Sequence, residues 1–321
     1  MKLTTVLVAL LLGAAAAGDA LGQAPYPNRP IRVVIPFGPG GFADIVMRLV
    51  GQRLSERSGQ QVVIENRPSA GGVVAAAAVT SAPPDGYTLF VLSSGIALSK
   101  SLLKTMPFDP ETAFAPISTL ALFDLLLLVK ADSPMRTLDD ALKSARANPS
   151  AFNIGTINPG STQNVTGELL RSATGIPMTI VPHRTTAKVL TSLLRGDTQI
   201  GIESYAALKA AIDAGQIRAI AASGDVRSAM QPNVPTLKES GVSAEVVGWN
   251  SLVALAQTPQ DVITFLNGHL RAIIESADFK QRMLDLGGEP KASTPAELGA
   301  RLKADIEMWA AVVKKAGIEP R

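Results

Sequence analysis

The sequence of 321 residues contains no cysteine and only two histidines, His183 and His269. The absence of cysteine excludes disulfide bonds, thiolate-bound metals and a thiol nucleophile. The two histidines lie too far apart in the sequence to have the spacing of paired metal ligands. Aromatic residues make up only 4% of the chain, as in α/β proteins whose cores are built on alanine, valine, leucine and isoleucine. We therefore expect neither a metal site nor a cofactor.

A strong excess of one charge is also missing. The formal net charge is +3 at pH 7, which is mild for a chain of this length. Such a balance argues against nucleic acid and against a membrane surface as the partner.

Long hydrophobic runs are missing as well. Residues Val6–Ala17 are apolar, but this stretch is too short to span a bilayer. It follows the basic residue Lys2 and precedes a cluster of small residues, which is the layout of a signal peptide. We expect a signal peptide over residues 1–24, cleaved after Ala20 or Ala24, and a mature protein in the periplasm. An uncleaved membrane anchor is the alternative.

Strand and helix patterns alternate along the rest of the chain. Alternation of this kind predicts an α/β fold with mostly parallel sheets flanked by helices. The predicted strands are Ile31–Pro36, Gln61–Glu65, Tyr87–Ser93, Leu125–Val129, Phe152–Gly155, Thr179–Pro182, Gln199–Glu203 and Arg218–Ser223, and an apolar segment, Leu252–Ala256, follows Trp249. The predicted helices are Ala43–Arg57, Gly72–Thr80, Leu138–Ala147, Thr162–Ala173, Ala187–Leu194, Ala206–Ala214, Pro259–Ser276 and Pro295–Lys315, the last begun by Thr294 with Glu297.

The order of these elements predicts two lobes. The rhythm restarts after residue 124, and a helical block closes the chain as if it returned to the first unit. We expect crossovers near Phe123–Lys130 and Gly248–Ala256. The first lobe would then contain residues 25–124 and 250–321, and the second residues 125–249.

The most informative motif is Gly38-x-Gly40-x-x-Ala43, which follows a strand and opens a helix. Free backbone N–H groups and the positive end of a helix dipole meet there, which suits an anion. With Glu65 about twenty residues on, the motif also meets the dinucleotide-binding fingerprint. The expected export of the protein and the stiff Pro39 disfavour a dinucleotide site. A turn with a purely structural role is the third interpretation of the motif. Asp44 is expected in the first helical turn, where a carboxylate orders the loop.

A similar loop, Gly155–Asn164, precedes a helix of the second half. Ser161 or Thr162 is a natural N-cap there, and plain capping is the alternative to ligand binding. Two such helix starts, one from each lobe, would face a common cleft, where ligands of α/β proteins bind.

Other candidates follow later strands. His183 would stack on or hydrogen-bond a ligand, and Arg184 would pair with a distal carboxylate. Alternatively, both lie at the surface at a strand end. Glu203 and Ser204 end another strand and would line the cleft. No G-x-S-x-G elbow and no set of nucleophile, base and orienting residue is present, which favours a binding protein over an enzyme.

Several motifs together resemble the Bug family of periplasmic solute receptors, the extracytoplasmic components of tripartite tricarboxylate transporters. They span the mature chain: Tyr26-Pro-Asn-Arg-Pro-Ile-Arg-Val-Val-Ile-Pro-Phe-Gly-Pro-Gly-Gly, Val62-Val-Ile-Glu-Asn-Arg-Pro68 with Ala70-Gly-Gly72, Pro84-Asp-Gly-Tyr-Thr-Leu89, Pro232-Asn-Val-Pro-Thr236 and Gly248-Trp249.

The resemblance implies a two-lobed Venus flytrap of the type II-like periplasmic binding proteins, without catalysis, that delivers a ligand to membrane permease subunits. It implies that a ligand carboxylate is held through backbone groups, hydroxyls and ordered waters. The positions that match are Gly40, Gly41, Phe42, Ser161, Thr162 and Asn164, with Ser93 and Ser94 alongside.

Three positions depart from the family's usual pattern. Phe42 replaces a small hydroxyl residue and adds an aromatic face, while His183 and Arg184 replace Tyr-Lys. These changes argue against citrate and favour a monocarboxylate or dicarboxylate, aromatic acids included. We expect a monomer whose lobes close on the ligand. The alternative functions are a secreted dinucleotide-binding oxidoreductase and a ligand-sensing subunit of a signalling system.

Overall fold

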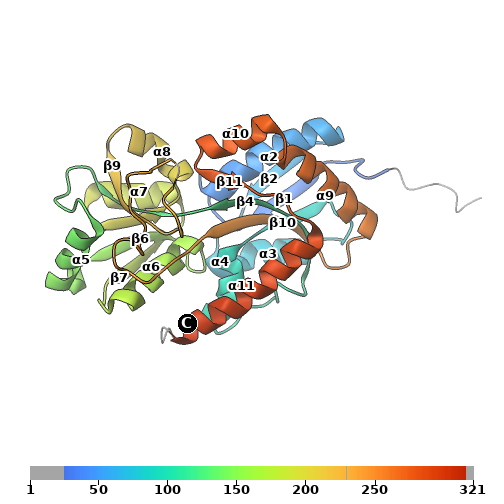
Figure 1. Cartoon of the computed structure of the whole chain (residues 1–321). Coiled ribbons are helices and arrows are strands. Elements are labelled where there is room, and N and C mark those ends of the chain that lie inside the picture. Colours follow the sequence, from blue (N-terminus) through green and yellow to red (C-terminus); the bar gives the residue numbers. More distant parts are fainter. Residues whose placement is uncertain (1–24, 229, 316–321) are drawn as a thin grey trace, which may run out of the picture.

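The computed structural model describes residues 25–228 and 230–315. The predicted signal peptide, residues 1–24, lies outside the described residues. Figure 1 shows two lobes side by side, with α5 to α8 in one and α2, α3, α4, α9, α10 and α11 in the other. Within the described ranges, no helix has the length and apolar character needed to cross a membrane.

The first lobe is built on a six-stranded sheet with the order β11-β4-β10-β3-β1-β2. Its central strands are apolar runs buried on both faces, as expected when helices cover both sides of a sheet. The strands are β1 (Ile31–Ile35), β2 (Val62–Asn66), β3 (Thr88–Ser93), β4 (Phe114–Phe123), β10 (Gly248–Leu255) and β11 (Gly288–Pro290).

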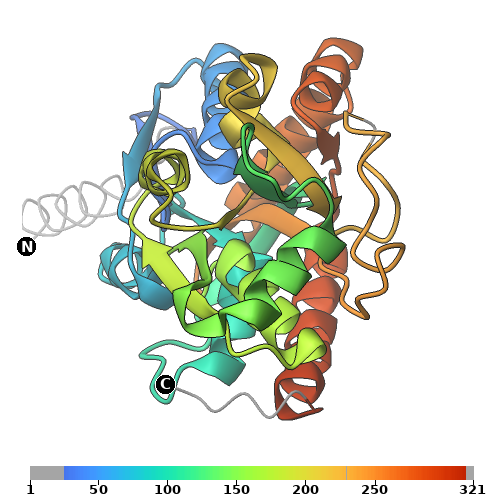
Figure 2. The same ribbon diagram turned by 90° about the vertical axis from the view of Figure 1, so that its left-hand side faces the viewer.

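The second lobe is built on a five-stranded sheet with the order β7-β6-β8-β5-β9. Its strands are β5 (Leu126–Lys130), β6 (Asn153–Ile157), β7 (Thr179–His183), β8 (Ile200–Glu203) and β9 (Ile217–Ala222). The chain passes directly from the first sheet to the second between β4 and β5. It returns through residues 223–228 and 230–247, irregular segments that Figure 2 shows along one side of the molecule.

Helices cover both sheets. In the first lobe α2 packs against β2 and α9, α3 against β1 and β3, and α11 against α4 and β4. In the second lobe α6 and α7 pack against β6 and β8, and α8 against β9. The helices are α2 (Phe42–Ser58), α3 (Val73–Thr80), α4 (Ser94–Leu102), α5 (Leu138–Ala147), α6 (Thr162–Thr174), α7 (Thr186–Arg195), α8 (Tyr205–Asp213), α9 (Gln260–Ile274), α10 (Ala277–Asp285) and α11 (Pro295–Lys315), with short 3₁₀ turns at η1 (Ala70–Gly72) and η2 (Pro149–Ala151).

The sheets are mixed, with most strands of each running in one direction, as expected, and a minority reversed. The parallel pairs are β1–β2, β1–β3, β6–β7 and β6–β8. Every antiparallel pair involves β4, β5 or β10, the strands next to the crossings between lobes. Parallel neighbouring strands need a crossover connection, usually a helix, within one sheet. A strand next to a crossing between two sheets has no such connection on that side, so it can pair antiparallel.

The predicted lobe limits, residues 25–124 with 250–321 and residues 125–249, remain a prediction. In the structure β10 begins at Gly248, two residues before the predicted return to the first lobe.

Candidate ligand-binding site between the lobes

The loop after β1 forms the first helix start. Gly40 has φ +79°, a left-handed conformation that glycine adopts without strain. Gly41 is the N-cap of α2 and offers no side-chain cap, so the first-turn N–H groups of Phe42 and Ala43 have no partner within the helix. The start of α2 therefore presents backbone donors and the positive end of its dipole.

Asp44 holds this loop in place. Its Oδ2 accepts hydrogen bonds from the Gly40 N–H at 3.0 Å and from Arg48 Nε at 2.9 Å, and its Oδ1 accepts one from Asn66 Nδ2. Burial alone would raise the pKa of Asp44, but these hydrogen bonds outweigh it and the pKa is lowered. The Gly40 amide is thus occupied within the protein, while Gly41 and Phe42 remain at the edge of a pocket.

The loop between β6 and α6 forms the second helix start. Ser161 is the N-cap, and its hydroxyl accepts from the Asn164 N–H at 3.1 Å. The Asn164 side chain donates to Thr156 Oγ1 at 3.2 Å, within its own lobe. Thr162 Oγ1 lies 2.9 Å from Ser94 Oγ of the first lobe. Ser161 and Asn164 therefore organise the loop, while Thr162 and Ser94 join the two lobes.

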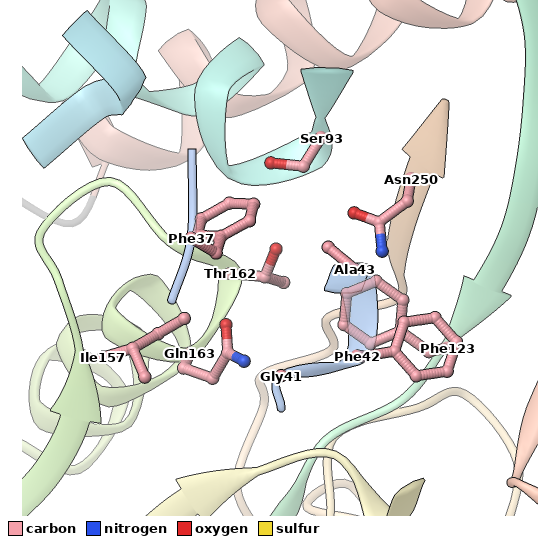
Figure 3. Close-up of a pocket in the computed structure, with 10 residues that line it drawn as sticks. All are labelled: Phe37, Gly41, Phe42, Ala43, Ser93, Phe123, Ile157, Thr162, Gln163 and Asn250. Carbon is pink, nitrogen blue, oxygen red and sulfur yellow. The ribbon is translucent and has the colours of Figure 1, made fainter. Parts of the chain in front are cut away.

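A pocket lies between these helix starts. About 310 Å³ of its space is free of protein atoms, its opening to solvent included. Figure 3 shows Ser93 and Asn250 on one side and Gln163 on the other, with Thr162 between them. The lining residues are Phe37, Gly41, Phe42, Ala43, Ser93, Phe123, Ile157, Thr162, Gln163 and Asn250, none of which carries a charge.

An aromatic pair forms one wall of the pocket. The rings of Phe42 and Phe123 have their centroids 4.5 Å apart at 40°. Phe42 comes from α2 and Phe123 from the end of β4, next to the crossing between the lobes. This rigid apolar surface suits the hydrocarbon part of a ligand.

Two polar groups of the first lobe are left without partners. Ser93 is 1% exposed and Asn250 is 2% exposed, yet Ser93 Oγ and Asn250 Nδ2 form no hydrogen bond. The two residues are Cα partners on the paired strands β3 and β10, and a register shift in the β4–β10 pairing follows Asn250. Buried polar groups are usually hydrogen-bonded, and β-bulges often lie beside functional sites. This pair has the character of a ligand contact.

Glu203 lies behind the pocket and is fully buried. Its Oε1 accepts from Thr186 Oγ1 at 2.6 Å, and its Oε2 accepts from Gln163 Nε2 at 3.1 Å and from the Ser204 N–H at 3.0 Å. Burial raises the pKa of Glu203, although the three hydrogen bonds oppose this effect. Ser204 is also buried, and its hydroxyl has no partner.

His183 and Arg184 do not line the pocket. His183 ends the edge strand β7, and burial lowers its pKa. The Arg184 side chain is exposed, while its carbonyl lies against Gly38 of the first lobe. Their position places them at the rim between the lobes rather than against the pocket residues.

The two lobes touch along a surface that we call the interlobe seam (Ser69–Gly72 and Ser94–Ser99 of the first lobe, Asn158–Thr162 of the second), where main-chain groups and a few polar side chains meet. Asn158 Nδ2 donates to the Ser69 carbonyl at 2.7 Å, and the Gly71 N–H donates to the Pro159 carbonyl at 3.0 Å. A Cβ on Gly95 would lie 2.5 Å from the Gly160 carbonyl oxygen. The structure is therefore a closed form with the lobes in direct contact.

Of the residues predicted for the site, the structure brings Gly41, Phe42, Ser93 and Thr162 to the pocket lining. Gly40, Ser94, Ser161, Asn164, Glu203 and Ser204 lie around it in structural contacts. Sequence reasoning missed Phe37, Ala43, Phe123, Ile157, Gln163 and Asn250. A signal for Asn250 was present, since it is a polar residue inside an otherwise apolar strand.

The acid expected of a dinucleotide site has another role. Glu65, at the end of β2, forms ion pairs with Arg32 at 3.3 Å and Arg67 at 2.5 Å. These pairs tie β2 to its neighbour β1 and to the following turn.

The comparisons with known proteins agree with this geometry. Residues 46–318 match the family model described as the tripartite tricarboxylate transporter family receptor. A solved structure of R. palustris Rpa4515 with adipate superimposes with a TM-score of 0.88 at 34% identity, covering 92% of this chain and 100% of that one.

Two further solved structures are similar over comparable lengths. The periplasmic binding protein BugD has a TM-score of 0.87 at 28% identity, covering 92% of this chain and 100% of its own. MatC from Rhodopseudomonas palustris with bound malate has a TM-score of 0.85 at 28% identity, covering 90% of this chain and 100% of its own.

These findings confirm the resemblance to Bug receptors and the two-lobed fold of a periplasmic binding protein. The chain belongs to the family of tripartite tricarboxylate transporter receptors.

Proposed function

We propose that this protein captures a small monocarboxylate or dicarboxylate in the periplasm and delivers it to the permease subunits of a tripartite tricarboxylate transporter. It acts as a monomer without catalysis, and its two lobes close on the ligand. The carrying observation is the unpartnered pair Ser93 Oγ and Asn250 Nδ2 beside the free amides at the start of α2. Similar proteins with adipate and malate bound support a carboxylate as the ligand.

The chemistry of the pocket suits one carboxylate held by neutral groups. Each helix start contributes about 1 kcal/mol to anion binding, and a hydrogen bond to a charged group contributes about 1.5–3 kcal/mol. Two helix starts with the Ser93 and Asn250 donors thus approach the roughly −8 kcal/mol of a micromolar site. Contact with Phe42 and Phe123 adds to this, and a ligand that bridges both lobes favours the closed state.

Calorimetry of the mature protein against a panel of linear and aromatic carboxylic acids tests the proposal. We expect at least one acid to bind in the micromolar range or tighter. Heat with a neutral sugar and with no acid would contradict the proposal.

Asn250→Asp sharpens this test, because it keeps the shape of the side chain but replaces a donor by a carboxylate. We expect the affinity for the best acid to fall at least about 100-fold through like-charge repulsion. Asn233→Asp is the matched control, since this exposed residue adds the same charge away from the pocket. Equal affinities in the two variants would remove Asn250 from the site.

A further inference from the structure

Gln163 is the one amide side chain that the second lobe contributes to the pocket. It is 6% exposed and lies in the first turn of α6. Its Nε2 donates to Glu203 Oε2 at 3.1 Å. Figure 3 shows its oxygen pointing toward Thr162, among the lining residues.

The hydrogen bond to Glu203, on the side away from the pocket, fixes the orientation of the Gln163 amide. Glu203 Oε2 already accepts from the Ser204 N–H, and Oε1 is paired with the Thr186 hydroxyl at 2.6 Å. When Glu203 is ionised, or when it carries its proton on Oε1 and donates it to the Thr186 hydroxyl, Oε2 is an acceptor. Turning the Gln163 amide over would bring its oxygen against this acceptor and leave Nε2 unpaired, which is costly in a buried place.

The two ends of the pocket therefore differ in hydrogen-bonding character. Ser93 and Asn250 offer side-chain donors at one end, while Gln163, which lies beside Gly41 in Figure 3, offers an acceptor oxygen at the other. Among the residues that the structure describes, no cation lines the pocket, and the ionisable group behind Gln163 is an acid. A second ligand carboxylate set against the Gln163 oxygen would meet an acceptor, with no side-chain cation of the lining to offset the repulsion.

We propose that Gln163 is a specificity-determining residue that selects a monocarboxylate whose far end carries a neutral hydrogen-bond donor, such as a hydroxyl or primary amide, over the corresponding dicarboxylate. Glu203 is the positioning residue that keeps the Gln163 oxygen facing the ligand. This inference rests on the proposed function and makes it narrower.

Matched acids that differ by one group test it: succinate against succinamate, and adipate against its monoamide. Each monoamide replaces one charged oxygen by an NH₂ donor at nearly constant size. We expect calorimetry to show about tenfold tighter binding of the monoamide in at least one pair, since it gains a hydrogen bond and avoids an acceptor facing an acceptor.

Three variants connect this preference to the named residues. Gln163→Leu removes the acceptor, and Glu203→Met removes the group that orients it, so both should bring the affinity ratio to within about twofold. Glu203→Gln should keep the preference, because a carboxamide oxygen can accept from Ser204 and Gln163 while its NH₂ donates to Thr186. Rescue by this conservative change would not follow from a merely structural role of Glu203.

Thr162→Val is the matched control within the pocket. Its hydroxyl is paired with Ser94, so its loss should alter both affinities by the same factor. Circular dichroism melts establish that each variant is folded.

The outcomes separate the two proposals. Binding of dicarboxylates equal to or tighter than monoamides in the unmodified protein overturns the role of Gln163 and leaves carboxylate capture intact. An unchanged ratio in Gln163→Leu does the same. Absence of binding by every acid overturns the proposed function and this inference with it.

Discussion

At the scale of single residues, Asp124 lies in an unusual place for a charge. It stands between β4 and β5, where the chain passes from one sheet to the other. Its Oδ2 is buried without a partner, and its side chain lies against Gly224. Burial raises the pKa of Asp124 from 3.8 to about 6. The carboxyl is thus tolerated most easily when neutral.

Stability should therefore depend on the ionisation of Asp124. The folded state binds its proton more tightly than the unfolded state does, so this residue lowers stability as pH rises from about 4 to above 6. The shift corresponds to roughly 3 kcal/mol at most. Asp124→Asn should be more stable than the unmodified protein at pH 7.5 and nearly equal to it at pH 3.5.

Urea unfolding across this pH range measures the difference between the two proteins. Asp132→Asn is the control, because that side chain is 71% exposed and pairs with Lys130. A difference for Asp124→Asn that does not change with pH would show that the carboxyl titrates normally.

Predictability from sequence was uneven among the site residues. Gly41 and Phe42 follow a glycine pattern that the chain displays openly, and Thr162 begins a helix after a clear turn. Asn250 and Phe123 carry no local motif, because they reach the pocket only through strand pairing and the crossing between sheets. The orientation of the Gln163 amide could not be predicted, because it depends on a hydrogen bond to Glu203, forty positions away in the sequence.

At the scale of elements, a helix or strand could be predicted where its ends carry clear sequence signals, such as a helix N-cap. Helix α11 begins as expected, since Thr294 and Glu297 exchange hydrogen bonds between side chain and backbone. Strand β4 was missed because Pro116 interrupts its pattern. Proline is tolerated there beside a register shift in the pairing with β10. Helix α4 was not predicted, because β3 ends at Ser93 and α4 begins at Ser94 with no connecting loop between them.

The start of α4 gives a prediction about closure. Because a Cβ on Gly95 meets backbone atoms of Gly160, Ser161 and Thr162 at 2.5 to 2.9 Å, the second lobe has to move away. Gly95→Ala should leave α4 intact, since alanine is the better helix former. Small-angle scattering should give a larger radius of gyration, and ligand affinity should fall about tenfold or more because closing becomes costlier.

Gly268→Ala is the control for this change. It lies within helix α9, and a Cβ there meets nothing within 4 Å. Identical scattering and affinity for the two variants would mean that the seam does not govern closure.

At the scale of the whole molecule, the charge distribution sets how binding responds to salt. The net charge is +3, and in the part of the chain that the structure describes no charged side chain lines the pocket. Recognition through dipoles and neutral donors is short-ranged, whereas pairing with exposed arginine or lysine would be screened. We expect the affinity for the best acid to change less than about twofold between 20 and 500 mM sodium chloride, by calorimetry. A tenfold loss would reveal a cation at the site.

The two-lobed design itself was predictable, because alternating elements and a returning C-terminal helical block define it. The mixed pairing was not, since strand direction at the crossings depends on how two sheets share one chain. The closed arrangement also lay beyond the sequence, because it depends on contacts between residues of different lobes, such as Asn158 with Ser69.

The interlobe seam and the pocket share Thr162 but otherwise use different residues. The seam consists mainly of carbonyls, amides and glycines, whereas most residues that line the pocket contribute a side chain. Substitutions at Phe42, Phe123 or Gln163 therefore change the ligand specificity without altering the interlobe contacts of the closed form. A receptor organised in this way can acquire a new ligand through a few point mutations while its closed shape stays the same.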